Sequence, residues 1–99
     1  MKIITLDGPH DSMSKNEVRS IGLEVLDLQT GETVDDANIT HTPPEGGTVL
    51  TIERSPDHPY INMEFGPFGM PGWHYVNVQA VGSLGSKPET LYAIYVKDA

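Results

Sequence analysis

The sequence contains no cysteine, no long apolar run and few basic residues, and each absence excludes a class of protein. Without cysteine, the fold cannot depend on disulfides, and thiolate metal sites and cysteine nucleophiles are excluded. No apolar run approaches the ~18 residues of a transmembrane helix, and residues 1–8 turn polar too soon for an export signal. Six basic against fourteen acidic residues give a net charge of -8, which disfavours nucleic acid and anionic membrane surfaces as partners.

The chain has the length of one small domain, residues 1–99. A domain of this size buries only about 60–65 % of the surface that its unfolded chain exposes, so its stability alone is modest. Docking onto a larger partner, or repetition as a homo-oligomer within an assembly, would add to that stability. A chain without cysteine also suits assembly in a reducing cytoplasm.

Short segments in which apolar and polar residues alternate recur between turn signals, and no segment predicts a helix of convincing length. The clearest alternation is at 73–81, followed by 90–97, where Tyr92, Ile94 and Val96 share one face. This spacing predicts an all-β, antiparallel sandwich of about seven strands. The predicted strands are 2–6, 18–28, 33–42, 49–54, 60–65, 73–81 and 90–97.

Three local expectations accompany this prediction. In the segment 18–28, the apolar residues occupy every second position up to Val25 and then switch to the other set of alternate positions. This switch predicts a β-bulge near Val25. Residues 55–59 read Ser-Pro-Asp-His-Pro and predict a turn that ends the strand 49–54. Residues 7–15 are polar and predict a loop.

The final hairpin resembles the immunoglobulin-like (Ig-like) domains of bacteria and phages, namely PKD domains and related repeats. In those domains a Pro-Gly turn leads into an aromatic residue and alternating valines, and a Gly-Ser loop precedes a last strand that ends in valine. The resemblance covers mainly residues 69–98 and implies an Ig-like fold. The residues that fill these places are Pro71-Gly72, Tyr75, Val76, Val78, Gly85-Ser86 and Val96.

A second resemblance is to FixH- and YtkA-like periplasmic proteins, which are linked to copper delivery. The segment Met70-Pro71-Gly72-Trp73 is similar to their Met-rich Gly–Trp segment, and residues 30–37, in the earlier half of the sequence, also resemble these proteins. Thioether and imidazole groups suit copper. The competing interpretation is that Met63 fills the core and that His58 is solvated in a turn. The candidate ligands of this alternative are His58, Met63, Met70 and His74.

Aromatic residues crowd the stretch 60–75 and indicate a binding surface. Phe65 and Trp73 are expected in the core, the latter as a plug between the sheets. If Phe68 and Met70 are exposed at the tip of loop 66–72, they form an apolar patch typical of protein interfaces. The alternative, weighed equally, is that the loop folds over one end of the sandwich. The candidate partner-binding residues are Phe68, Met70, Pro71, Trp73 and Tyr60.

Motifs of catalysis and of calcium binding are missing. The sequence has neither Gly-x-Ser-x-Gly nor a phosphate-binding loop, so we expect no enzyme and no cofactor. Glu53 and Glu64 could face each other across strands, although such positions are usually solvated. Glu32, Asp35 and Asp36 could supply oxygen ligands to calcium, but the Asp-x-Asn-x-Asp-Gly pattern is absent.

The leading hypothesis is a non-catalytic structural or binding module, namely a virion accessory protein of a phage capsid or tail. Its partners would be other protein subunits, with assembly in the host cytoplasm. Residues 43–47 and 66–72, or the N-terminal segment, would make the docking contact. One alternative is the copper-handling domain in the periplasm. Another is a carbohydrate- or surface-binding module, in the periplasm or at the cell surface, with Trp73, Tyr75 and Tyr60 as stacking platforms.

Overall fold

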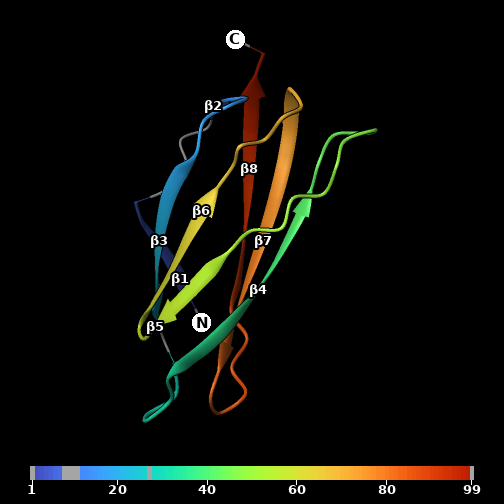
Figure 1. Ribbon diagram of the computed structural model, residues 1–99. Coiled ribbons are helices and arrows are strands. Elements are labelled where there is room, and N and C mark those ends of the chain that lie inside the picture. The colour runs from blue at the N-terminus through green and yellow to red at the C-terminus, as the bar shows by residue number, and fades with distance from the viewer. Residues whose placement is uncertain (1, 8–11, 27, 99) are drawn as a thin grey trace.

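The computed structural model describes residues 2–7, 12–26 and 28–98, which form two four-stranded sheets that face each other (Figure 1). The first sheet contains, in spatial order, β1 (Lys2–Asp7), β3 (Arg19–Leu26), β6 (Tyr60–Phe65) and β5 (Arg54–Asp57). The second contains β2 (Ser12–Ser14), β8 (Glu89–Lys97), β7 (Gly72–Gly82) and β4 (Val34–Thr42). Neighbouring strands are antiparallel, except that β2 runs parallel to β8. The predicted all-β sandwich is confirmed.

The core lies between the sheets and follows the alternation of the strands. Successive side chains of a strand point to opposite faces, so every second residue of β6, and of β7 from His74 onward, is buried, whereas in β8 the inward positions are half-buried at first and fully buried only at Ile94 and Val96. Ile94 and Val96 point inward as predicted, and Tyr92 packs against the core. The buried apolar residues are Met13, Ile21, Leu23, Val25, Val34, Ala37, Ile52, Ile61, Met63, Phe65, Phe68, Val76, Val78, Ala80, Ile94 and Val96.

The predicted strand 49–54 is wrong, and the predicted turn 55–59 is right only for residues 58–59, because residues 55–57 belong to a strand. Ile52 is buried, as its parity indicated, but residues 47–53 form no ladder. The strand β5 begins only at Arg54 and includes Pro56, which pairs with Ile61 of β6. Proline is tolerated there because β5 is the edge strand of its sheet, where one side of the backbone needs no partner.

Two further local expectations are corrected. No bulge occurs at Val25, which is buried; the ladder between β3 and β6 is regular, and the register shift between β1 and β3 falls between Thr5 and Asp7. Part of the predicted loop 7–15 is the short strand β2, because Met13 is buried against the core. Residues 8–11 of that loop lie outside the described residues.

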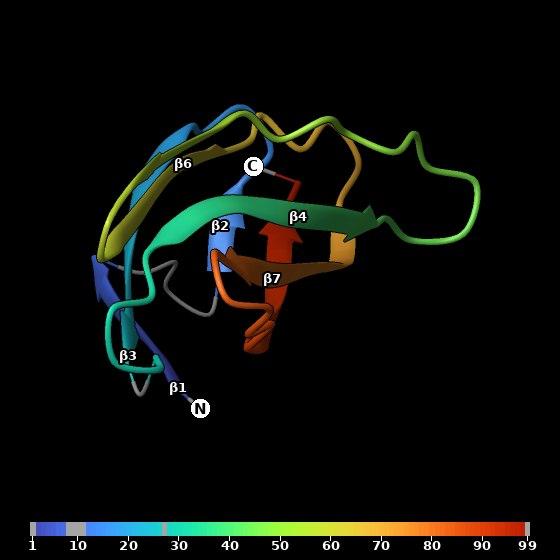
Figure 2. The same cartoon turned by 90° about the horizontal axis from the view of Figure 1, so that it is seen from below.

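The molecule is elongated, with extents of 46 × 23 × 18 Å. Figure 2 shows the segment that follows β4 reaching out beyond the two sheets before the chain returns to β5 and β6. The loop between β6 and β7 lies at the same end, because β4 and β7 are antiparallel neighbours. No stretch of the described residues forms a helix of the length and apolarity needed to cross a membrane.

Candidate functional site

A buried pair of histidines lies where β4 ends and β7 begins. His41 Nε2 and His74 Nδ1 are 2.8 Å apart, and both rings point inward. The Leu50 amide donates to His41 Nδ1 at 2.7 Å, so that nitrogen carries no proton. His41 therefore donates from Nε2 to His74, and His74 donates from Nε2 to the Met70 carbonyl at 2.7 Å. The backbone donor at one end and the backbone acceptor at the other set the direction in which the hydrogen bonds run through both rings.

This series of hydrogen bonds connects two loops to the second sheet. Leu50 belongs to the loop 43–50, and Met70 belongs to the loop 66–71; these two segments contain most of the residues for which the sequence predicted a docking contact, and after that prediction we call them the docking loops. Burial lowers the pKa of His41, and the neighbouring His74 lowers it further. A proton on His41 Nδ1 would face the Leu50 N–H, so the arrangement disfavours the charged form.

Of the two alternatives weighed for loop 66–72, an exposed tip at Phe68 is wrong, and a loop that folds over the end of the sandwich is confirmed. Phe68 is only 2 % exposed, and its ring lies 5.1 Å from the ring of His41 and 4.9 Å from that of His74. It also meets Phe65 edge-on at 6.5 Å. Loop 66–71 therefore covers the end of the sandwich with Phe68, while Met70 and Pro71 stay exposed.

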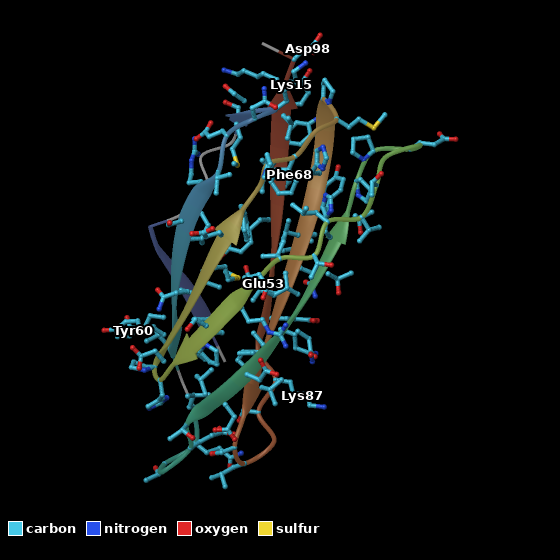
Figure 3. All side chains as sticks on the ribbon, viewed as in Figure 1. Lys15, Glu53, Tyr60, Phe68, Lys87 and Asp98 are labelled. Atoms are coloured by element: carbon cyan, nitrogen blue, oxygen red, sulfur yellow. The ribbon has the colours of Figure 1, made fainter. Side chains whose placement is uncertain are left out.

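The docking loops enclose a cavity of about 340 Å³ with the two histidines in its lining. Val49 is 65 % exposed and Met70 is 36 % exposed, and both line the cavity. The two loops are in contact, because a Cβ added to Gly47 would lie 3.1 Å from the Met70 Sδ. Figure 3 shows Phe68 near the end of the sandwich from which these loops extend.

Trp73 is not a plug between the sheets, as the sequence had suggested. The inward position at the start of β7 is taken by His74, so the alternation places Trp73 on the outer face of the second sheet, where it is 50 % exposed. Tyr75 is exposed on the same face. Tyr60 begins β6 in the other sheet, at the end opposite the docking loops (Figure 3). The five candidate contact residues are therefore distributed over three surfaces and the core.

The four candidate copper ligands are not brought together. His58 accepts a hydrogen bond at Nδ1 from the Val34 amide, and Val34 pairs with Gly82, at the opposite end of β7 from His74. Met63 is buried in the core, and both ring nitrogens of His74 are already hydrogen-bonded. Within the described residues, no group of three or more His, Asp or Glu side chains could hold a metal ion.

Glu32, which sequence reasoning considered only as a calcium ligand, is a buried structural carboxylate. It accepts hydrogen bonds from the amides of Gln29, Leu84 and Ser86, at 3.1, 2.9 and 3.0 Å. The Ser86 hydroxyl donates at 2.5 Å and is the main cause that lowers the pKa of Glu32 to about 2. Glu32 thereby joins the turn before β4 to the turn between β7 and β8.

The other acidic candidates do not complete an ion site. Asp36 accepts from Arg54 Nε at 3.1 Å, and Asp35 accepts from the Thr33 hydroxyl at 2.9 Å. Glu53 and Glu64 line a hollow of about 520 Å³ on the outer face of the first sheet, and both are exposed.

The sequence offered no signal for the buried pairing of His41 with His74, which are 33 residues apart.

The two sheets, their strand order and the crossing of the chain between them define an Ig-like sandwich. Among solved structures, the chain is similar to the crystal structure of the Lin-41 filamin domain, with a TM-score of 0.69. The likeness covers 98 % of this chain and 93 % of that chain at 11 % sequence identity, so it shows the fold alone. No protein-family model and no curated protein matches the sequence. The Ig-like fold class is confirmed, and the finer resemblances to PKD, FixH and YtkA domains stay predictions.

Proposed function

We propose that the chain is a non-catalytic binding module that docks onto a larger protein assembly through the docking loops. The observation that carries the proposal is the exposure of Val49 and Met70 from two loops that meet over one cavity. Val49 and Met70 are already partly buried, so burying the rest of either side chain would contribute only a part of the about 1.5–3 kcal/mol that full burial of such a side chain contributes. Apolar side chains of this kind, and methionine in particular, are enriched in protein interfaces.

The docking loops have a fixed base, which lowers the entropic cost of binding. The chain of hydrogen bonds through His41 and His74 holds one backbone group of each loop, at Leu50 and at Met70. Phe68 packs beneath them as part of the core. Loops that are held in place before association lose less conformational freedom on docking.

The assembly that we propose is a virion, with the chain decorating a phage capsid or tail. Three properties of the sequence support this choice. A single small domain gains stability from docking, a cysteine-free chain folds in a reducing host cytoplasm, and a net charge of -8 keeps the free chain soluble before assembly. The resemblance of residues 69–98 to phage-type Ig-like domains points in the same direction.

The first experiment isolates the protein from its native source and measures its mass by size-exclusion chromatography with light scattering. We expect elution with a megadalton particle. Elution as the free 10.8 kDa chain would overturn the proposal. Elemental analysis of the same fraction tests the copper alternative, which requires near-stoichiometric copper.

The second experiment tests the surface. Particles depleted of the chain are mixed with purified variants, and rebinding is measured by co-sedimentation. We expect Val49→Asp and Met70→Asp each to weaken rebinding by about tenfold or more, which corresponds to about 1.4 kcal/mol. The control is Leu84→Asp, because Leu84 is 55 % exposed at the opposite end of the sandwich. Equal loss in the control variant would place the contact elsewhere.

A further inference from the structure

The outer face of the second sheet carries a cluster of large apolar side chains that the docking loops do not explain. Trp73 on β7 lies directly opposite Tyr95 on β8, with ring centroids 5.3 Å apart and planes at 65°. Tyr75 and Leu91 share the same face, and Leu91 is 62 % exposed. We call these four residues the stacking face. They are four of the nine large apolar side chains that the described residues expose.

The register of the two strands fixes this face toward solvent. Residues of the opposite parity, such as His74, Val76 and Ile94, are buried between the sheets. Turning Trp73 inward would require a one-residue slip of β7, and that slip would bring every buried residue of the strand to the surface. The exposure of the stacking face is therefore a consequence of the whole fold rather than of one side-chain rotamer.

A small residue leaves room within the stacking face. Ala93 pairs with Tyr75 and stands on β8 between Leu91 and Tyr95. Residues of one face are about 7 Å apart along a strand, so the larger neighbours flank a shallow floor about as wide as one sugar ring. Such a floor accepts a flat group that lies on it rather than a side chain that enters a deep pocket.

Neutral polar side chains border this floor. Thr42 on β4 pairs with Tyr75, and Thr40 pairs with Asn77 in the next row. Hydroxyl and amide groups both donate and accept hydrogen bonds. The charged residues of β8, Glu89 and Lys97, stand at its two ends, and Asn77 Nδ2 donates to Glu89 at 3.2 Å. The middle of the face is uncharged in a protein whose net charge is -8.

We propose that the stacking face binds a neutral saccharide. A sugar ring has an apolar C–H face and a rim of hydroxyl groups, which matches aromatic platforms bordered by Thr and Asn. Trp73 and Tyr75 stack on the rings, and Thr42 and Asn77 bond to the hydroxyls. An anionic glycan would be repelled by the acidic protein, and so would a second copy of this chain with the same net charge. This inference does not depend on the docking loops or on their partner.

Trp73 is the single tryptophan of the chain, so its fluorescence reports this face alone. The test titrates the purified protein with neutral hexasaccharides of β-1,4-glucose, α-1,4-glucose, β-1,4-N-acetylglucosamine and β-1,4-mannose, up to about 10 mM. We expect a saturable change with at least one of them. In Tyr75→Ala, which retains the reporter, we expect about tenfold weaker binding. Tyr60→Ala is the matched control, because it removes an exposed tyrosine from the other sheet, and it should bind as the wild type does.

Three results would overturn the inference. The first is the absence of any saturable change with all four hexasaccharides while circular dichroism shows the protein folded. The second is equal loss of binding in Tyr60→Ala and in Tyr75→Ala. The third is a fluorescence change that follows protein concentration without sugar and accompanies a dimer in light scattering, which would assign the face to self-association. Met70→Asp, designed against the docking loops, should leave saccharide binding unchanged, so the two proposals can fail separately.

Discussion

At the scale of single residues, two buried polar groups at opposite ends of the sandwich do what apolar packing cannot. His41 links two loops to β4 and β7, and Glu32 links two turns. Both are almost fully buried, so each must have its hydrogen-bonding groups satisfied. Both also titrate, which makes the stability of each end depend on pH.

Lowering the pH from about 7.5 to about 5 should destabilise the protein through His41. The pKa of this group is lowered from 6.5 by burial in the folded protein, so the unfolded chain binds the proton more readily. Its contribution to stability is complete above pH 6.5 and is lost as the pH falls through the folded pKa. Urea denaturation at a series of pH values measures this as a falling free energy of unfolding.

The variant His41→Gln provides the comparison. It should be less stable near neutral pH by about 1–3 kcal/mol, because hydrogen-bonding groups of Leu50 and His74 lose their partner. Its free energy of unfolding should also depend less on pH over the same range. A dependence as steep as that of the wild type would assign the acid sensitivity to other groups.

A second prediction concerns Glu32→Gln. The amide that replaces the carboxylate has one oxygen instead of two for four donors, so the variant should be less stable near neutral pH. The pKa of Glu32 is lowered from 4.5 to about 2, so its contribution is present above pH 4.5 and is lost as the pH falls through about 2. The difference in melting temperature between wild type and variant should therefore shrink with acid. A constant difference would show that the charge is not its source.

At the scale of elements, the strands follow from alternation, and the connections depend on close approaches of the backbone. The alternation of apolar and polar residues predicted β6, β7 and β8 together with their buried faces. Where every second residue is apolar, only one face of the strand can point into the core. This pattern failed for β5, because Leu50 and Ile52 alternate over a segment that packs on the core without joining a ladder. The expectation of a buried Trp73 failed because it departed from the alternation: the parity of Val76 and Val78, extended back along β7, already places His74 inward and Trp73 outward.

The candidate site was predictable only in part, because local sequence patterns do not show which residues meet across the sandwich. Composition and loop signals marked 43–47 and 66–72 as loops at one end of the sandwich, and offered exposure of Met70 together with Phe68 as one of two alternatives. The pairing of His41 with His74, and the capping by Phe68, depend on which residues meet across the two sheets. That information lies in the register of β4 with β7, which no local pattern of the sequence encodes.

Gly66→Ala tests one of these close approaches. Gly66 has a φ of 99°, and an added Cβ would overlap the backbone oxygen of Glu17. The backbone strain alone costs about 1–3 kcal/mol, and the overlap adds to it because a backbone atom cannot move aside. We expect a strongly lowered melting temperature. The matched control is Gly69→Ala in the same loop, where a Cβ would meet nothing within 4 Å and should change stability by about 0.5 kcal/mol or less. Equal effects of the two substitutions would contradict this account of the loop.

At the scale of the whole molecule, the net charge of -8 opposes folding through self-repulsion. The ion pairs between Lys15 and Asp98 and between Arg54 and Asp36 are partly or largely exposed, and such pairs contribute little. Screening by salt should therefore weaken the repulsion among the acidic residues more than it weakens the attraction within the ion pairs. We expect the free energy of unfolding to rise as sodium chloride is increased from about 0.01 M to about 0.15 M, where the screening length falls from about 30 Å to about 8 Å. Urea denaturation at each concentration measures it, and a decline would show that the ion pairs dominate.

The parallel pairing of β2 with β8 has a mechanical consequence. The chain enters the second sheet at Ser12 and leaves it at Lys97, and these two strands run side by side in the same direction. A tension applied between Ser12 and Lys97 would pull β2 and β8 in opposite senses along their common axis. The backbone hydrogen bonds between them would then be loaded together in shear instead of opening one after another. A module held at Ser12 and pulled at Lys97 would resist extension at this pair of strands.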